Sequence, residues 1–585
     1  RWVQKGRTQY HNRHGGPAEV AKNVLTQWSI VGLTSEELTR DGGLFSGGIT
    51  PEVVSDWGMS YSEVFLDEMV ALAKMQIQVN WSCGFSLEGE AIQRDIVTEF
   101  TRKAHRRGIH VCAYMSLTNI FWKEAFQREP QLEGYLAKYT DGSPHLYGNS
   151  QARYLACVNQ SEWLEYLKKK MRMAIEEAEV DHVYFDNVFA DCACDICVAG
   201  FADYTRHLTG EAIDLPEINP PSTKRLFLET NTDDQFSIAD HDVRHRREYL
   251  HRRYLAWRLA EALRELRDYA FSLKSPLAFS ANNHLYPLIN DVANVLYSQD
   301  TRVPQPEWSN VPICRYLDAD SDGWKPVVTN HQLGDADPRL SMAEAMAFQS
   351  YPYQITHRAY NLFYRDHPEL FTEVESVSKI GVFLEWPRRR PYYLMPLGFA
   401  NLMYEVILLD KWSHERLDLY DVILVPDLEA VSDELFEALQ TYSGGRGTLI
   451  CTGTSTLYDE SGLRREQPMR IVGEMVGPNS RIDAQVLDLI RAASEPQPIQ
   501  IEAPNNVVAN LVRRVKGTEY LVHLVNYDDF PVGPIRVRVN IGDRVFTRAI
   551  AHSPDNPTLD IDIELIDGEF FSLDTLEVYS VVVLT

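Results

Sequence analysis

Between about residues 70 and 360, short apolar runs alternate with segments whose apolar side chains repeat at helical spacing. The clearest unit begins at 92–104, where apolar residues recur every three or four positions. Gly108 follows as a left-handed stop signal, and 109–115 is a continuous apolar run typical of a buried strand. Because strands and helices alternate in this way around parallel sheets, the pattern predicts an α/β fold.

Eight segments of this region have the length and composition of strands. They are 24–31, 77–81, 109–115, 183–185, 277–280, 292–298, 326–329 and a weaker one at 354–356. A long insertion is predicted over 201–242, followed by a helix over 243–273. About eight strands in about 370 residues predict a (β/α)8 TIM barrel that spans residues 1–375.

Two smaller blocks follow the predicted barrel. Residues 376–500 combine apolar runs with one amphipathic helix, which predicts a flavodoxin-like α/β domain. The predicted elements of this domain are strands at 379–384, 421–425 and 448–451 and a helix at 433–442. In residues 501–585 apolar and polar positions alternate, which predicts a small C-terminal β-sandwich.

The charge balance narrows the choice of partners. Asp and Glu number 83 against 57 Lys and Arg, a formal net charge of −26, which opposes binding to nucleic acid and to anionic lipid surfaces. The longest apolar run, 393–409, contains Pro396 and Glu405, so no transmembrane helix is expected. No signal peptide is recognisable in the basic, polar start of the chain, and a cytoplasmic protein is expected.

Three of the eight cysteines fall within six residues, at Cys192, Cys194 and Cys197. Thiolates two and three residues apart on a tight loop can converge on one tetrahedral zinc ion, with a fourth thiolate from elsewhere in the chain. Four sulfur ligands close the coordination shell. The cluster therefore predicts a structural zinc site, and no catalytic cofactor is expected. The alternatives are a chance cluster of reduced thiols and a local disulfide.

In a (β/α)8 barrel the reactive groups lie just past the carboxyl ends of the strands. The residues at these positions are rich in amides, imidazoles and aromatic rings, a mixture suited to sugar hydroxyls and to the apolar face of a sugar ring. The candidates for substrate binding are Asn80, Trp81, Asn119, Trp122, Asn187, Asn283, His284 and His331.

Two carboxylates are the candidates for catalysis. Asp186 directly follows a buried strand, where an unused carboxylate is costly, and Asp300 ends the run 295–299. Glycoside hydrolysis needs such a pair. Glu229, Glu307 and Asp320 compete with Asp300 for the second role.

Cys157, followed by Cys192, Cys194 and Cys197, resembles the four-cysteine zinc site of the family 42 β-galactosidases. The order of the blocks is similar to that family too, and it implies zinc ligation by these four cysteines and a trimer formed through the flavodoxin-like domain. That family carries an Asn-Glu pair after the fourth strand, whereas this chain has Asp186, Asn187 and Val188. Here the segment 182–187, together with the Cys-x-Cys that follows it, looks closer to a group of glycosyl-hydrolase-like barrels. These are related in turn to α-L-fucosidases, in which an Asp after the fourth strand is the nucleophile.

The leading hypothesis is an exo-acting, retaining glycosidase that releases a terminal fucoside or galactoside. Asp186 is expected to attack the anomeric carbon and Asp300 to protonate the leaving oxygen. Trp81 and Trp122 are expected to stack on the sugar, and Asn119, Asn283 and His284 to bind its hydroxyls. The alternatives are a non-catalytic, oligomeric carbohydrate-binding barrel and a β-galactosidase with a different carboxylate pair.

Overall fold

The computed structural model describes the chain from residue 61 onward with gaps, together with one short strand before it. The described residues are 26–28, 61–72, 74, 76–147, 153–219, 238–282, 287–301, 304–306, 308–321, 323–331, 337–352, 357–384, 391–445, 447–472, 482–504, 506–556, 561–566 and 570–585. They form two compact units, one of residues 1–297 and 324–326 and one of 298–323 and 327–585. Within the described part, no helix has the length and apolar character needed to cross a bilayer.

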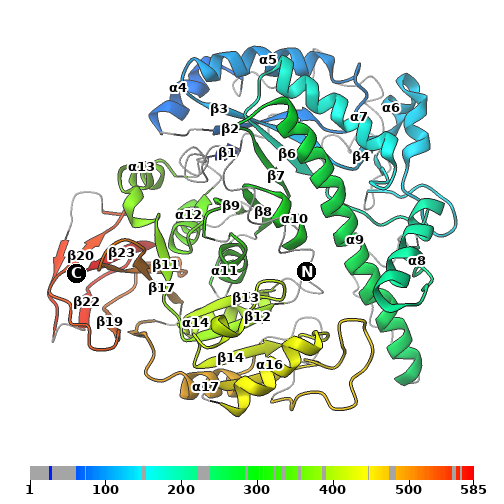
Figure 1. Ribbon diagram of the computed structural model, residues 1–585. Coiled ribbons are helices and arrows are strands. Elements are labelled where there is room, and N and C mark those ends of the chain that lie inside the picture. Colours follow the sequence, from blue (N-terminus) through cyan, green and yellow to red (C-terminus); the bar gives the residue numbers. More distant parts are fainter. Residues whose placement is uncertain are drawn as a thin grey trace. The chain divides into compact units, whose positions relative to one another are not determined.

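The first unit is built on a five-stranded sheet in the order β1-β2-β3-β6-β7, and all its neighbouring strands are parallel. Its strands are β1 (Thr26–Trp28), β2 (Gln76–Ser82), β3 (His110–Ser116), β6 (His182–Asp186) and β7 (Ala278–Ala281). The helices around it include α4 (Glu63–Ala71), α5 (Ala91–His105), α7 (Ser161–Arg172) and α9 (Ile238–Leu273), and α8 (Asp195–Thr209) packs against α9, as Figure 1 shows. Each of these strands lies within or beside a segment predicted from the apolar runs.

The two faces of this sheet differ in chemistry because alternate residues of a strand point to opposite sides. One face is apolar and buried, and α5 packs against it on β2 and β3. Its side chains are those of Ile77, Val79, Trp81, Val111, Ala113, Met115, Val183, Phe185, Phe279 and Ala281. The other face carries polar side chains, and the register places Tyr114 beside Tyr184 and Ser116 beside Asp186.

His182 shows how the polar face is satisfied inside the unit. Its ring nitrogens lie 2.5 Å from Gln76 Nε2 and 2.6 Å from Ser280 Oγ. Complete burial lowers the pKa of His182 to about 3, so the imidazole is neutral at pH 7. At the amino end of the same strand, Asp181 accepts hydrogen bonds from His105 (2.8 Å) and Lys274 (3.0 Å), and these partners hold its pKa well below its usual range.

The remaining strands of the predicted barrel are β8 (Leu296–Thr301), β9 (Val327–His331) and β10 (Tyr351–Pro352), in the sheet order β10-β9-β8. At its start β8 belongs to the first unit, where Tyr297 forms a parallel bridge with Asn282. Seven of the eight predicted strands are therefore present. The predicted strand at 354–356 lies outside the described residues, and β10 ends just before them. Their closure into one barrel stays a prediction.

The second unit contains a four-stranded parallel sheet in the order β13-β12-β14-β15. Its strands are β12 (Ile380–Leu384), β13 (Tyr404–Leu408), β14 (Val422–Pro426) and β15 (Thr448–Thr452). Numbered along the chain, this order is 2-1-3-4, which is typical of flavodoxin-like sheets. Helix α16 (Asp433–Gly444) begins as predicted, because the Ser432 side chain accepts a hydrogen bond from the Leu435 amide at 3.1 Å. Strand β13 was not predicted from the sequence.

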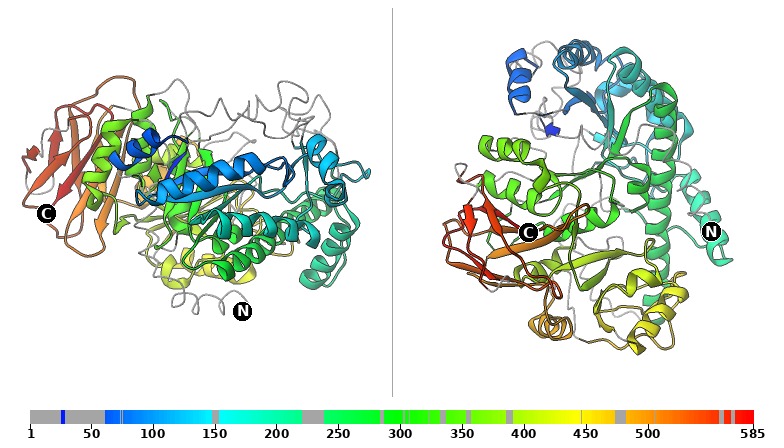
Figure 2. Two further views of the ribbon diagram at one scale, coloured as in Figure 1. Left: turned by 90° about the horizontal axis from the view of Figure 1, so that it is seen from above. Right: turned by 60° about the vertical axis from the view of Figure 1, so that its left-hand side comes forward.

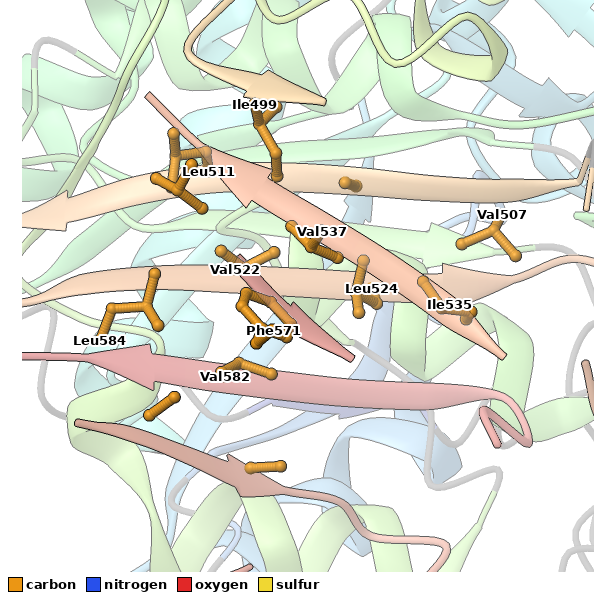
Figure 3. Close-up of a cluster of buried hydrophobic side chains, with 14 of the residues drawn as sticks. Ile499, Val507, Leu511, Val522, Leu524, Ile535, Val537, Phe571, Val582 and Leu584 are labelled. Atoms are coloured by element: carbon orange, nitrogen blue, oxygen red, sulfur yellow. The ribbon is translucent and has the colours of Figure 1, made fainter. Parts of the chain in front are cut away.

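The C-terminal part of this unit consists of two antiparallel sheets, drawn in orange and red in Figure 2. One has the order β11-β17-β18-β23-β20-β21 and the other β16-β19-β22. Their strands are β11 (Val374–Ser376), β16 (Ile499–Glu502), β17 (Val507–Arg514), β18 (Tyr520–Asn526), β19 (Ile535–Val539), β20 (Ala549–His552), β21 (Ile561–Ile563), β22 (Phe570–Leu573) and β23 (Tyr579–Leu584). Leu511, Val522 and Leu584 of the first sheet share a buried core with Val537 and Phe571 of the second, so the two form a β-sandwich (Figure 3).

Candidate active site and metal centre

Asp186 is the last residue of β6, and its carboxylate is held between the two neighbouring strands. The Tyr114 hydroxyl of β3 donates to Oδ2 at 2.5 Å, and Nδ2 of Asn282, just past β7, donates to Oδ1 at 2.7 Å. The side chain is partly exposed. Two neutral donors stabilise the ionised form of a carboxylate and fix its orientation. This arrangement gives a carboxyl group of fixed orientation at the carboxyl edge of the sheet, where α/β proteins place their reactive groups.

Tyr114 acts as a donor because its hydroxyl cannot ionise in this position. Burial and the adjacent Asp186 carboxylate raise the pKa of Tyr114 well above its usual range. Asn187 helps to position the Tyr114 hydroxyl. Its backbone φ is +55°, and its Nδ2 donates hydrogen bonds to Tyr114 Oη at 3.4 Å and to Ser116 Oγ at 3.1 Å. Asn187 is 7% exposed, so this predicted sugar-binding residue positions Tyr114 and Ser116 instead.

The loop after β2 is fixed by a buried ion pair. Glu90 Oε1 accepts hydrogen bonds from the amides of Cys83, Gly84 and Phe85, while Oε2 lies 2.8 Å from Lys170 Nζ. Both charged side chains are almost completely buried. A carboxylate that accepts this many bonds and is paired with a lysine is structural, so Glu90 holds the β2 loop beside the edge where Asp186 lies.

Arg153 brings a positive charge to the same region. It opens β5 (Arg153–Leu155), which pairs with β4 (Asn119–Phe121) in the segment after β3. Its guanidinium carbon lies 4.1 Å from the centre of the Tyr147 ring and 5.7 Å from that of Phe121. Burial lowers the pKa of Arg153, while the charge of Asp186 is among the influences that raise it. Neither Arg153 nor Tyr147 was predicted, because both lie in a segment without strand or helix periodicity.

Two predicted sugar contacts are contradicted by burial. Trp81 is 1% exposed and its indole N–H donates to the Lys170 carbonyl at 3.0 Å. It lies on the apolar face of the sheet with Ile77 and Val79, so it has no free ring face for stacking. Asn119 is 2% exposed, and its Nδ2 donates to the Cys83 carbonyl at 2.8 Å. It joins the loops after β2 and β3 and does not bind a sugar hydroxyl.

Two other predicted sugar-binding residues are partly exposed. Asn80 lies on the polar face of the sheet, in register with Tyr114, and is partly exposed. Trp122 begins α6 (Trp122–Arg128) and is half-buried, with its ring 5.8 Å from that of Tyr154. Sugar binding by either residue stays a prediction.

The remaining candidates are placed only in part. Asn283 and His284 lie outside the described residues. Asp300 lies in β8 and His331 ends β9, and only their backbone positions are described. Of the competing carboxylates, Asp320 is fully buried and paired with Lys411 at 2.5 Å, which contradicts a catalytic role. Glu229 and Glu307 lie outside the described part of the chain.

The four predicted cysteines form a cluster. The Sγ atoms of Cys157, Cys192, Cys194 and Cys197 all lie within 4.8 Å of one another and are buried. The separations from Cys157 to Cys194 and Cys197 are 3.9 and 3.4 Å, and that between Cys194 and Cys197 is 3.6 Å. A tetrahedral zinc ion with Zn–S bonds of about 2.3 Å requires S–S separations of about 3.8 Å. The cluster therefore fits such an ion, and its distances exclude a disulfide.

Hydrogen bonds surround this cluster. Asn159 Nδ2 donates to Cys197 Sγ at 3.1 Å, and the backbone amides of Lys138 and Cys194 donate to Cys192 Sγ at 3.4 Å. Arg258 of α9 orients Asn159, since its Nε lies 2.5 Å from Asn159 Oδ1. Donors of this kind stabilise thiolates and orient metal ligands. Tyr147, which stacks on Arg153, packs against the cluster, so the four cysteines support the loop that carries Arg153.

Comparisons with known proteins agree with this architecture. A family model described as a domain of unknown function, DUF6259, matches residues 92–204. This range includes Asp186, Arg153 and all four cysteines. No curated protein matches the chain in sequence.

Solved structures resemble almost the whole chain. The α-L-fucosidase isoenzyme 2 from Paenibacillus thiaminolyticus superposes with a TM-score of 0.60 at 12% identity, over 90% of this chain and 96% of its own. Gan42B, a GH42 β-galactosidase from G. stearothermophilus, gives 0.63 at 11% identity over 92% and 97% of the two chains. A β-galactosidase from Bacillus circulans sp. alkalophilus gives 0.64 at 12% identity over 92% and 98%. These likenesses confirm the predicted resemblance at the level of the fold.

Proposed function

We propose that the protein is an exo-acting glycoside hydrolase of the retaining type in which Asp186 is the nucleophile. The observation that carries this proposal is the Asp186 carboxylate itself, fixed at the carboxyl end of β6 by Tyr114 and Asn282. A nucleophilic carboxylate must be ionised and aimed, whereas an acid catalyst must hold a proton. Two neutral donors and partial exposure suit the first role.

The fold agrees with the proposed activity but does not determine it. The similar structures bear the names of β-galactosidases and an α-L-fucosidase, and one fold hosts many activities. We therefore propose a terminal galactoside or fucoside as the substrate class. Its ring is placed against Trp122, and its hydroxyls are assigned to Asn80, Asn283, His284 and His331.

In the proposed reaction an Asp186 oxygen bonds to the anomeric carbon while the bond from that carbon to the leaving oxygen breaks. Asp300, at the carboxyl end of β8, gives the leaving oxygen its proton. Water then attacks the glycosyl-enzyme ester, Asp300 takes a proton from that water, and the Asp186 carboxylate is regenerated. Tyr114 and Asn282 hold the carboxylate in line for both steps.

The other parts of the chain have proposed supporting roles. Zinc held by Cys157, Cys192, Cys194 and Cys197 would have a full shell of sulfur ligands, so it fixes loops and supplies no reactive water. The proposed layout is a barrel over 1–375, a flavodoxin-like domain over 376–500 that forms a trimer, and the β-sandwich over 501–585. The net charge of −26 favours an uncharged or carbohydrate partner over nucleic acid.

The test is a panel of aryl glycosides that covers α-L-fucose, α- and β-galactose, α-L-arabinose and β-glucose. On any substrate that is cleaved, Asp186→Asn should lower kcat on the order of 10³-fold or more and leave sugar binding and folding intact. The matched control is Asp181→Asn at the opposite end of β6. It should lower the urea midpoint, because Asp181 loses its ionic partners, and leave kcat unchanged. Unchanged turnover in Asp186→Asn would refute the proposal.

The same panel separates the non-catalytic alternative. A carbohydrate-binding barrel predicts that free monosaccharides bind and that no glycoside is cleaved. A β-galactosidase with a different carboxylate pair predicts cleavage of β-galactosides that survives in Asp186→Asn.

A further inference from the structure

Arg153 is a largely buried cation without an anionic partner among the described residues. Its Nε is inaccessible to solvent and makes no hydrogen bond there, and its recorded partners are the rings of Tyr147 and Phe121. The Asp186 carboxylate is occupied by Tyr114 and Asn282, and no ion pair joins it to Arg153. In a chain with 83 carboxylate side chains, an unpaired arginine beside a functional edge requires an explanation.

Two other arginines of this unit have carboxylate partners. Arg107 is paired with Glu63 and Asp67, and Arg128 with Glu88 and Glu124. Arginines are seldom buried unless they are paired, because removing the charge from water is costly. Stacking on aromatic rings offsets only part of this cost.

The position of Arg153 relative to Asp186 points to a ligand. Arg153 lies opposite Phe121 in the β4–β5 pair, two residues along β4 from Asn119, which binds the β2 loop. The Tyr147 ring lies edge-on to Phe189 at 5.6 Å, three residues beyond Asp186. Arg153 and Asp186 also interact electrostatically. A cation held by aromatic rings near a fixed carboxylate suits a sugar that is attacked at one carbon and carries negative charge at another.

We propose that Arg153 binds an anionic substituent of the sugar, a carboxylate of a uronate or a sulfate ester, and that the preferred substrate is an acidic glycoside. The inference rests on the proposed function of Asp186 and specifies the substrate class at that site. Arginine presents parallel N–H donors that match the paired oxygens of such oxyanions. Bound substrate thus supplies the partner that the described residues do not.

The test compares matched pairs of 4-nitrophenyl glycosides, both anomers of galactoside against galacturonide and of glucoside against glucuronide, with a 6-sulfated galactoside as a separate arm. The preferred acidic substrate should exceed its neutral counterpart in kcat/KM, and Arg153→Met should reduce that advantage roughly 10- to 150-fold, the range for a lost charged hydrogen bond. Cleavage of the neutral partner should change less than threefold. The uronate and sulfate arms show which oxyanion is bound.

Two controls keep the test decisive. Arg153→Lys keeps the positive charge but loses the paired N–H donors of the guanidinium, so it should retain part of the preference for acidic substrates. Arg206→Met removes an exposed arginine of α8 and should leave every ratio unchanged. The zinc content of each variant reports whether the loop has kept its structure.

Failure of this inference differs from failure of the proposed function. A preference for neutral sugars, or an equal loss on neutral and acidic substrates in Arg153→Met, overturns the inference and leaves Asp186 as nucleophile. If no glycoside is cleaved, the proposed function fails, and binding of free galacturonate or glucuronate is then compared between wild type and Arg153→Met. Binding that is lost in the variant supports the anion site, and no binding to wild type overturns it.

Discussion

Replacing Asn159 with aspartate should weaken the metal centre without removing a ligand. In the wild type, Asn159 Nδ2 donates to Cys197 Sγ at 3.1 Å. In Asn159→Asp this donor is replaced by a carboxylate oxygen, which places a like charge beside the thiolate, while the pairing with Arg258 is kept. Loss of such a supporting bond costs 10- to 100-fold in metal affinity, or about 1.4 to 2.8 kcal/mol.

The assay treats the zinc-loaded protein with increasing chelator and measures the zinc that each chain retains. The wild type should hold one zinc per chain, and the midpoint for Asn159→Asp should fall at 10- to 100-fold less chelator. Arg258→Met keeps the donor but frees the amide group, so its midpoint should move tenfold or less. A wild type that holds no zinc, or an Asn159→Asp midpoint within threefold of the wild-type midpoint, would show that Asn159 does not support a zinc site.

Three further predictions follow from the described contacts. Tyr114→Phe should lower kcat/KM about 10- to 150-fold in steady-state assays, because the Asp186 carboxylate loses the hydrogen bond that holds it in position; an unchanged kcat/KM contradicts this. The pKa of His182 is about 3 in the folded protein against about 6.5 in the unfolded chain, so the imidazole is neutral in the fold. Its contribution to the free energy of unfolding is therefore complete above pH 6.5. It is lost at about 1.4 kcal/mol per pH unit as the pH falls toward 3. Urea unfolding between pH 7 and 5 should show this dependence, and His182→Gln should reduce it. Gly84→Ala should destabilise the protein by about 1 to 3 kcal/mol in the same assay, because φ is +113° and a Cβ would lie 2.3 Å from the Asn119 carbonyl oxygen; wild-type stability would contradict it.

The fold was largely predictable because its strands and helices carry strong periodicity. The helix over 92–104 and the strand over 109–115 appear as α5 and β3 with shifts of one residue. The strand β13 was missed because Glu405 interrupts its apolar run, and the structure shows that Tyr420 donates a hydrogen bond to this carboxylate at 2.9 Å. A polar residue with a local partner can therefore lie in a strand that its sequence does not reveal.

The site was predictable only where position along a strand decides the chemistry. The position of Asp186 at the end of a buried strand agrees with the sequence, while its catalytic role stays a prediction. Cys192, Cys194 and Cys197 were recognised from their spacing and Cys157 from the resemblance to the family 42 β-galactosidases. Trp81 was wrongly assigned to sugar stacking, although the alternation of side chains along the strand indicates its face. It alternates with Asn80 and lies on the same apolar face as Val79. Arg153 reaches the site from an irregular segment after β3, and its position depends on tertiary pairing that no local pattern encodes.

Covalent trapping tests directly whether Asp186 is the nucleophile of a retaining glycosidase. A 2-deoxy-2-fluoro glycoside of whichever sugar is cleaved should form a stable ester with a retaining nucleophile, which mass spectrometry of the digested protein can locate. We expect one bound sugar per chain on the peptide that contains Asp186, and no bound sugar in the Asp186→Asn variant. A label on another carboxylate, or a product of inverted configuration with no trapped sugar, would contradict it.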